Sequence, residues 1–154
     1  MDEVFEEKQR VMVTGAAGFV GGCLVRALTL HEAYIPISVF RSEGDLQLIS
    51  NNVYAANVSP ETDWAVALAG VSIVVHAAAR VHVMNESSAT ALDEYRRVNF
   101  HGTLKLARQA AEAGVRRFVF ISSIKVNGEA TSLARPYCAD DPVNPVDPYG
   151  VSKH

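Results

Sequence analysis

Hydrophobic and polar positions change period along the chain in a regular order. Apolar stretches of strand length occur at residues 10–14, 34–40, 52–58, 71–79 and 116–123. The last two are nearly continuous in apolar residues, which is typical of strands buried on both faces. After the first stretch, apolar residues recur at helical spacing, at Val20, Leu24, Ala27 and Leu28. The pattern therefore predicts strands that are separated by helices.

Capping and breaking residues predict where the other helices begin and end. Residues 59–61 (Ser-Pro-Glu) combine an N-cap, a first-turn proline and an acidic residue, so a helix is predicted to begin there and to stop at Gly70. Residues 90–113 predict a long helix that a glycine closes. The segment 129–148 is rich in proline and aspartate and is predicted to be a loop, and residues 149–154 open one more helix.

Strands and helices alternate from one end of the chain to the other, without an internal repeat. This order predicts an α/β fold in which helices cover both faces of a parallel sheet and the crossovers are right-handed. We expect the doubly wound strand order 3-2-1-4-5. The predicted domain covers residues 10–154, and residues 1–9 form a flexible acidic tail before it.

Composition limits the classes of protein that this sequence can represent. Its 154 residues suit one domain, and a formal net charge of −3 indicates neither a nucleic-acid partner nor a membrane surface. The N-terminus lacks the pattern of a signal peptide, and no apolar run is long enough to span a bilayer. Cys23 and Cys138 form no CxxC pair, so we interpret them as reduced thiols of a cytoplasmic protein. His76 and His82 lie in no ligand pattern, so no metal site is predicted.

A glycine-rich segment, VMVTGAAGFVGG (residues 11–22), joins the first strand to the first helix. Unpaired backbone N–H groups and the positive end of the helix dipole make such a junction an anion site. Gly15 permits the tight turn, Gly18 lets a pyrophosphate approach the backbone, and Gly21 lets the helix pack closely on the strand. The segment therefore predicts dinucleotide binding, although three glycines can also serve packing alone.

Five motifs in order extend this prediction to the whole chain: TGAAGFVGG, VVHAAA, VNFHGT, VFISSIKVNG and DPYGVSKH. Together they resemble the extended short-chain dehydrogenase/reductase family, specifically its nucleotide-sugar epimerases of the UDP-glucose 4-epimerase type and their relatives. The resemblance runs from about Val11 to His154. It implies a Rossmann fold, NAD or NADP as cofactor, and hydride transfer at a sugar carbon. Family members continue into a sugar-nucleotide domain, so we expect this chain to lack that domain and to be inactive alone.

Tyr149 and Lys153 are four residues apart and share one face of a helix. A tyrosine is a poor base near neutral pH unless a nearby cation favours its phenolate. The resemblance implies that Tyr149 is the general acid/base and that Lys153 supplies this cation and holds the nicotinamide ribose. It further implies that Ser123, or its neighbour Ser122, holds the reacting oxygen. The alternatives are a chance aromatic–lysine pair and two serines that cap the end of a strand.

Other residues of the resemblance surround the cofactor. The implied cofactor-binding set consists of Gly15, Ala17, Gly18, Phe19, Val20, Gly21, Arg41, Asn57, Val58, His76, Ala77, Ala78, Ala79 and Lys153. The family uses the backbone of 76–79 around the adenine-side ribose and the pyrophosphate. Asn57 replaces the family's common aspartate, and its amide can still bind the adenine amino group. Asn99 matches the helix asparagine that organises the active site, with a solvated helix position as the alternative.

Departures from the family pattern refine the predicted activity. Arg41 stands where NAD-preferring members have an acidic residue, and arginine matches phosphate oxygens, so the sequence favours NADP over NAD. Arg41 stacked on the adenine or exposed to solvent is the alternative. Ile124 and Lys125 replace the Asp-Glu pair of the dehydratases, which argues against water elimination, and Asn127 replaces a tyrosine of the sugar pocket.

The predicted function is an NAD(P)-dependent nucleotide-sugar 4-epimerase that acts on a UDP-sugar. A 4-ketoreductase of a nucleotide-4-keto-sugar shares its motifs, and an NAD(P)-binding regulatory protein without catalysis is the alternative from another class. The strand at 116–123 is expected to leave an unpaired sheet edge, which favours self-association. The sequence therefore allows a homodimer as well as a monomer.

Overall fold

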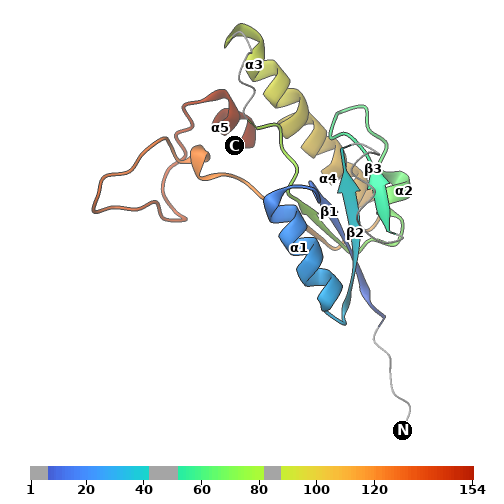
Figure 1. The fold of residues 1–154 in the computed structure, drawn as a ribbon. Helices are drawn as coiled ribbons and strands as arrows, with labels where there is room; N and C mark the ends of the chain where they lie inside the picture. The colour runs from blue at the N-terminus through green and yellow to red at the C-terminus, as the bar shows by residue number, and fades with distance from the viewer. Residues whose placement is uncertain (1–6, 42–51, 82–87) are drawn as a thin grey trace.

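Five parallel strands form one sheet in the order β3-β2-β1-β4-β5, which confirms the predicted order (Figure 1). The computed structural model describes residues 7–41, 52–81 and 88–154. The strands are β1 (Gln9–Thr14), β2 (Tyr34–Phe40), β3 (Val53–Ala55), β4 (Ile73–His76) and β5 (Arg117–Phe120). In register, Met12 of β1 lies between Ile37 of β2 and Val74 of β4. Because all strands run the same way, the loops after them meet at one edge of the sheet.

Helices lie on both faces of this sheet. They are α1 (Phe19–Leu30), α2 (Ala65–Leu68), α3 (Ser88–Tyr95), the π-helix η2 (Arg96–Gly102), α4 (Thr103–Glu112), the 3-10 helix η3 (Ile124–Val126) and α5 (Pro148–Lys153). α1 covers one face, and α2 and α4 cover the other (Figure 1). α5 packs beside α3 and η2, and the loop between η3 and α5 projects as an arm.

The core divides into two clusters because successive strand residues point to opposite faces. Met12, Ile37 and Val74 join Trp64 and Leu106 beneath α2 and α4. Val11, Val13, Phe40 and Val75 face Val25 of α1 in the other cluster. Thr14 and His76 continue the rows of Met12 and Val74 at the carboxyl edge, so two polar groups end an otherwise apolar layer.

The helix predicted to begin at Ser59 begins instead at Ala65, so this prediction was wrong in its start. The Ser59 hydroxyl accepts from the Glu61 backbone N–H at 3.3 Å, but it closes a turn and not a helix. The Asp63 carboxylate accepts from the Ala65 N–H at 3.0 Å, and the Trp64 N–H donates to the side chain of Gln109 at 2.7 Å. The bond from Trp64 to Gln109 of α4 holds this segment in a non-helical conformation, although the capping residues predicted a helix there.

Two other elements differ from their predictions. The helix predicted over 90–113 is continuous in direction, but its middle third is the π-helix η2. The strand predicted to be buried on both faces, β5, pairs only with β4 and exposes alternate side chains. Val119 and Ile121 are exposed because no described element covers the α1 face of the sheet at this edge.

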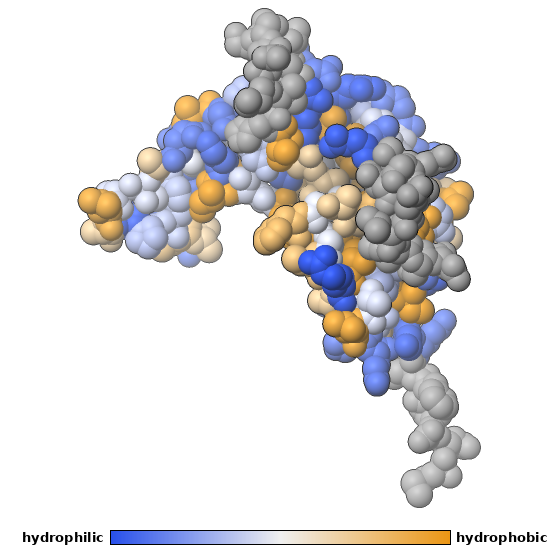
Figure 2. Space-filling model, viewed as in Figure 1, coloured by the Kyte–Doolittle hydropathy of each residue, from blue (hydrophilic) through white to orange (hydrophobic). Residues whose placement is uncertain are grey.

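Apolar side chains also reach the surface elsewhere. Figure 2 shows hydrophobic residues at the surface on the α1 side and at the tip of the projecting arm. They include Phe19 and Leu30 at the two ends of α1, and Leu133 in the arm. No helix in the described part of the chain is both long and apolar enough to cross a membrane.

Candidate active site

The turn between β1 and α1 is closed by glycines. Gly15 has a φ of +70°, and a Cβ there would lie 2.8 Å from the backbone nitrogen of Ala78. A Cβ on Gly21 would collide with the carbonyl oxygen of Gly15. A Cβ on Gly18 would meet only the Gly15 oxygen, at 3.2 Å. Gly15 and Gly21 are therefore required by the fold itself, whereas Gly18 is exposed and a Cβ there would meet one backbone oxygen, which would have to move by a few tenths of an ångström.

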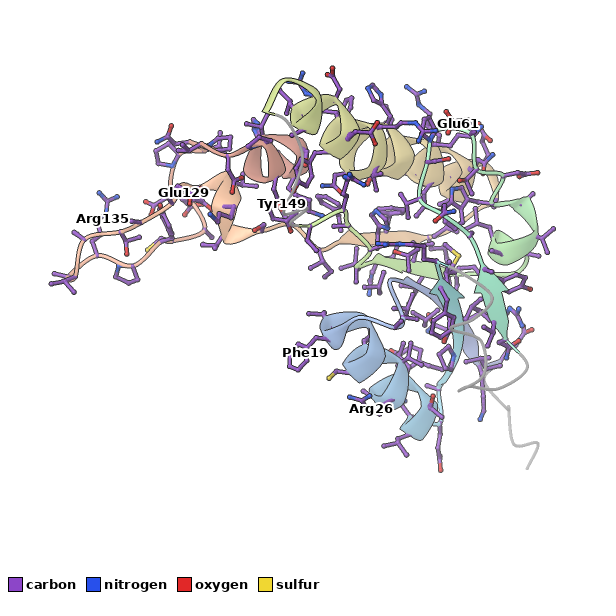
Figure 3. All side chains as sticks on the ribbon, turned by 45° about the horizontal axis from the view of Figure 1, so that its top comes forward. Phe19, Arg26, Glu61, Glu129, Arg135 and Tyr149 are labelled. Carbon is purple, nitrogen blue, oxygen red and sulfur yellow. The ribbon has the colours of Figure 1, made fainter. Side chains whose placement is uncertain are left out.

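The N-terminus of α1 presents backbone N–H donors to the solvent-exposed side of Gly18. Gly18 is the N-cap in an extended conformation, no side chain of the described residues caps it, and the first turn carries no acidic residue. Ala17, Phe19 and Val20 are exposed beside it, and Figure 3 shows Phe19 directed away from the sheet at the start of α1. Free N–H groups at a helix N-terminus form an anion site, so these residues fit the pyrophosphate of a dinucleotide.

His76 is enclosed completely at the end of β4, with 0% of its surface exposed. Its Nδ1 lies 2.6 Å from Thr14 Oγ1 and its Nε2 lies 2.9 Å from Thr103 Oγ1. Burial, followed by the charge of Lys153, lowers the pKa of His76 to about 4. The side chain therefore binds β1 to α4 as a neutral imidazole, and only the backbone of His76 remains for the predicted cofactor role.

The loop after β4 is held by the same network. Thr14 Oγ1 accepts from the Ala78 N–H at 3.2 Å, and Ala78 packs against Gly15. Ala77, Ala78 and Ala79 are half-buried beside the glycine turn. The structure thus places these three alanines beside the glycine turn.

The adenine side of the predicted site lies at the ends of β2 and β3. Arg41 directly follows β2 and is exposed, which is compatible with both the phosphate role and its alternatives. Asn57 is exposed, and its carbonyl oxygen accepts from the Thr62 hydroxyl at 2.6 Å. Val58 packs on the core and lies next to Gly102, where a Cβ would be 2.8 Å from its side chain.

Asn99 is buried to 3% exposure in the π-helix η2, so the alternative of a solvated helix position is wrong. Its Oδ1 accepts from the Arg80 N–H at 2.7 Å, and its Nδ2 donates to the Arg80 carbonyl at 3.0 Å. The same Nδ2 lies 2.9 Å from the Ser152 hydroxyl, which donates to the Tyr149 carbonyl at 2.7 Å. Asn99 thus joins the loop after β4 to the helix that carries Tyr149 and Lys153.

Lys153 is buried at the end of α5, with 4% of its surface exposed. Its Nζ lies 4.0 Å from the centre of the Phe120 ring, and burial lowers its pKa to about 8. Tyr149, one turn earlier on α5, is half-buried and meets the ring of Tyr95 edge-on at 6.2 Å. The helix thus brings the predicted base and its cation to the end of β5.

The two serines after β5 have different partners. Ser123 Oγ accepts from the Lys125 N–H at 3.2 Å and so caps η3, while the Ser122 hydroxyl donates to the Lys153 carbonyl at 3.4 Å. Both line an open hollow of about 460 Å³ together with Asn127, whose side chain donates to the Asp141 carbonyl. Ser123 thus caps the 3-10 helix η3 and not the strand end, and Ser122 bonds α5.

Sequence reasoning missed several residues that hold this site together. These residues are Ser152, Thr14 and Thr103. Their helices and strand were predicted from the spacing of apolar residues, and that spacing does not indicate which polar side chains form hydrogen bonds inside the protein. Gly150 had one available signal, since it is a glycine inside a predicted helix. His82 lies outside the described residues, and no group of His, Cys, Asp or Glu suited to a metal ion is present among the residues described.

This fold and this set of residues agree with the comparison to protein families. The NAD dependent epimerase/dehydratase family matches residues 11–154, and the chain belongs to this family. The chain is 44% identical to a UDP-glucose 4-epimerase of Vibrio cholerae over 93% of its length, and it covers 43% of that relative. It is 35% identical to a 3 beta-hydroxysteroid dehydrogenase/Delta 5-->4-isomerase of Mycobacterium tuberculosis over 78% of its length and 33% of the relative's.

Solved structures show the same fold. A short-chain dehydrogenase/reductase superfamily protein from Agrobacterium tumefaciens with bound NAD superposes with a TM-score of 0.77 at 33% identity, over 94% of this chain and 42% of that one. MoeE5 in complex with UDP-glucose and NAD gives 0.77 at 34% identity, over 94% and 45%. The chain thus spans less than half the length of these relatives.

Proposed function

We propose that this chain forms the cofactor-binding and catalytic part of an NAD(P)-dependent nucleotide-sugar 4-epimerase that acts on a UDP-sugar. The observation that carries the proposal is the attachment of α5 to the sheet. Through Ser152 and Asn99, this short helix is tied to the loop after β4. This attachment supports a site at the carboxyl edge of the sheet, to which Tyr149 and Lys153 on α5, Ser123 after β5 and the glycine turn after β1 would all contribute.

The residues at this edge have separate roles in the proposed oxidation of a sugar alcohol. Tyr149 takes the hydroxyl proton of the sugar and returns it, and Lys153 favours its phenolate by positive charge. Ser123, with Ser122 as the alternative, holds the reacting oxygen by a hydrogen bond. Asn99 acts through the backbone of Arg80 and through Ser152. The bound nicotinamide supplies the hydride chemistry, and the chain's residues position it.

Cofactor binding is assigned to the open turn at Gly18 and to the loop after β4. The N–H groups at the start of α1 hold the pyrophosphate, and the alanines 77–79 pass close to it. Arg41 favours NADP by the geometry of its guanidinium, whereas the solved neighbours named above hold NAD. The sugar-nucleotide pocket is assigned to the part of the relatives that this chain does not span, so the 154 residues alone are expected to bind cofactor without turnover.

A chimera tests the proposal. Residues 1–154 are joined to the C-terminal remainder of the Vibrio cholerae relative and incubated with UDP-glucose and NAD or NADP. Interconversion of UDP-glucose and UDP-galactose without net cofactor consumption supports the epimerase, and its loss in Tyr149→Phe supports the assigned base. Stoichiometric oxidation of NADPH by a UDP-4-keto-sugar alone would support the ketoreductase instead. A chimera that binds cofactor but reacts with no UDP-sugar contradicts both and leaves the regulatory function.

A further inference from the structure

The first turn of α5 rests directly on the backbone of Lys125. A Cβ on Gly150 would lie 2.7 Å from the Lys125 carbonyl oxygen and 3.2 Å from its carbonyl carbon. Real Cβ atoms do not approach backbone so closely, and here the neighbour is rigid main chain. The glycine that follows Tyr149 therefore lets η3 and α5 make direct contact.

The Lys125 side chain strengthens the same contact by charge. Its Nζ lies 3.2 Å from Asp147 Oδ2, and Asp147 Oδ1 accepts from the Gly150 N–H at 2.5 Å as the N-cap of α5. Lys125 also pairs with Glu129, which lies on the exposed side and takes no part in capping α5. Hydrogen bonds to Glu129 and Asp147 raise the pKa of Lys125, so it remains a cation.

Lys125 reaches the strand end as well. Its backbone N–H donates to Ser123 Oγ at 3.2 Å. One residue is therefore bonded to the serine through its main chain and to the cap of the tyrosine's helix through its side chain. Figure 3 labels Glu129 close to η3 and Tyr149 close to α5.

We propose that Lys125 is a positioning residue that sets where Tyr149 lies relative to Ser123, by clamping the N-cap of α5 onto η3. Its relevance to catalysis rests on the proposed function, which gives Ser123 and Tyr149 their roles. The other described anchors of α5 are Asn99 through Ser152, whose hydroxyl also bonds the Tyr149 carbonyl, and Ser122 through the Lys153 carbonyl. Lys125 and Asp147 hold the opposite end of the helix, at the N-cap two residues before Tyr149.

The experiment follows the Tyr149 ring directly in the full chain. The five tyrosines are replaced by 3-fluorotyrosine, and the Tyr149 signal in the fluorine NMR spectrum is assigned by its loss in Tyr149→Phe. Lys125→Met removes the clamp. Asp147→Asn removes the charge but keeps a good N-cap. Glu129→Gln is the matched control, because it removes the other partner of Lys125, and Lys125→Arg tests rescue by a second cation.

We expect the Tyr149 signal to shift and broaden in Lys125→Met and in Asp147→Asn, because the ring leaves its edge contact with Tyr95. The signal should stay in place in Glu129→Gln and return in Lys125→Arg. Amide exchange at Gly150 and Val151 should become about three- to fivefold faster in the first two variants only, as expected for one partly exposed ion pair.

An unmoved Tyr149 signal in both Lys125→Met and Asp147→Asn would overturn the proposal. An equal shift in Glu129→Gln would do the same, since it would reveal a general loosening. Affinity for NAD and NADP is measured on the same samples. If the wild-type chain bound neither cofactor while the Tyr149 signal responded as expected, the proposed function would fail and the clamp would stand.

Discussion

Lowering the pH should destabilise this protein through His76. The imidazole is fully buried between Thr14 and Thr103, and its pKa is lowered to about 4 from an ordinary value of 6.5. Below pH 6.5 the imidazole of the unfolded chain binds a proton, whereas the buried imidazole of the folded chain stays neutral until about pH 4. The free energy of unfolding therefore falls as the pH falls. The full difference corresponds to about 3 kcal/mol, of which about 2 kcal/mol is lost between about pH 7.5 and about pH 5.

Urea denaturation at a series of pH values measures this effect. The matched variant is His76→Gln, which keeps a polar side chain but has no titrating group, and whose stability should change much less over the same interval. Lys153→Met separates the causes. Because burial is the larger cause and the Lys153 charge the smaller, that variant should keep most of the pH dependence. Equal slopes in wild type and His76→Gln would refute the reasoning, since the loss would then come from other groups.

Five further substitutions probe the site and the sheet edge. Gly18→Val should abolish NAD binding in calorimetry and cost the fold less than Gly21→Ala does in thermal denaturation, because a Cβ on Gly18 would lie 3.2 Å from the Gly15 oxygen, whereas one on Gly21 would lie 2.2 Å from it. Arg41→Ala should weaken NADPH binding more than NADH binding, by roughly 1.5–3 kcal/mol if the guanidinium reads a phosphate; an equal effect on both would reject that role. Asn99→Ala should speed amide exchange in α5, because its bonds to that helix are lost. Ile121→Lys, an exposed position directly after β5, should reduce any self-association seen by analytical ultracentrifugation, and an unchanged association would exclude this edge of the sheet.

Features with a local cause were predictable from the sequence. The glycine turn follows from backbone geometry within seven residues, and Gly15 has the positive φ that the tight turn requires. The alternation of strands and helices fixes the sheet order through general rules on crossovers. The same kind of local signal misled at Ser59, because a serine before a proline caps a turn as well as a helix. The deciding contact there, from Trp64 to Gln109, spans 45 residues.

The polar contacts that join different elements of the site could not be predicted, because they connect residues far apart in sequence. The bond from Asn99 to Ser152 spans 53 residues, and that from Thr14 to His76 spans 62. The spacing of apolar residues indicates that such positions face the interior, but it does not indicate which polar group of another element will be their hydrogen-bond partner. The exposure of β5 had no signal either, since its apolar run is that of a covered strand, whereas no element among the described residues covers its α1 face.

The position of Tyr149 illustrates what this distribution of contacts means for catalysis. α5 has six residues, and so short a helix is not stable without tertiary contacts. Its place is therefore set by residues outside it: Asn99 from η2, Ser122 from the end of β5, and Lys125 from η3. Each of these contacts is weak alone, and in the proposed reaction they must together keep the tyrosine within a fraction of an ångström of its productive position, at hydrogen-bond distance from the reacting oxygen. Because they restrain the same short helix, their losses cannot be independent. The proposed catalytic geometry thus belongs to the network around α5 and not to the YGVSK sequence by itself.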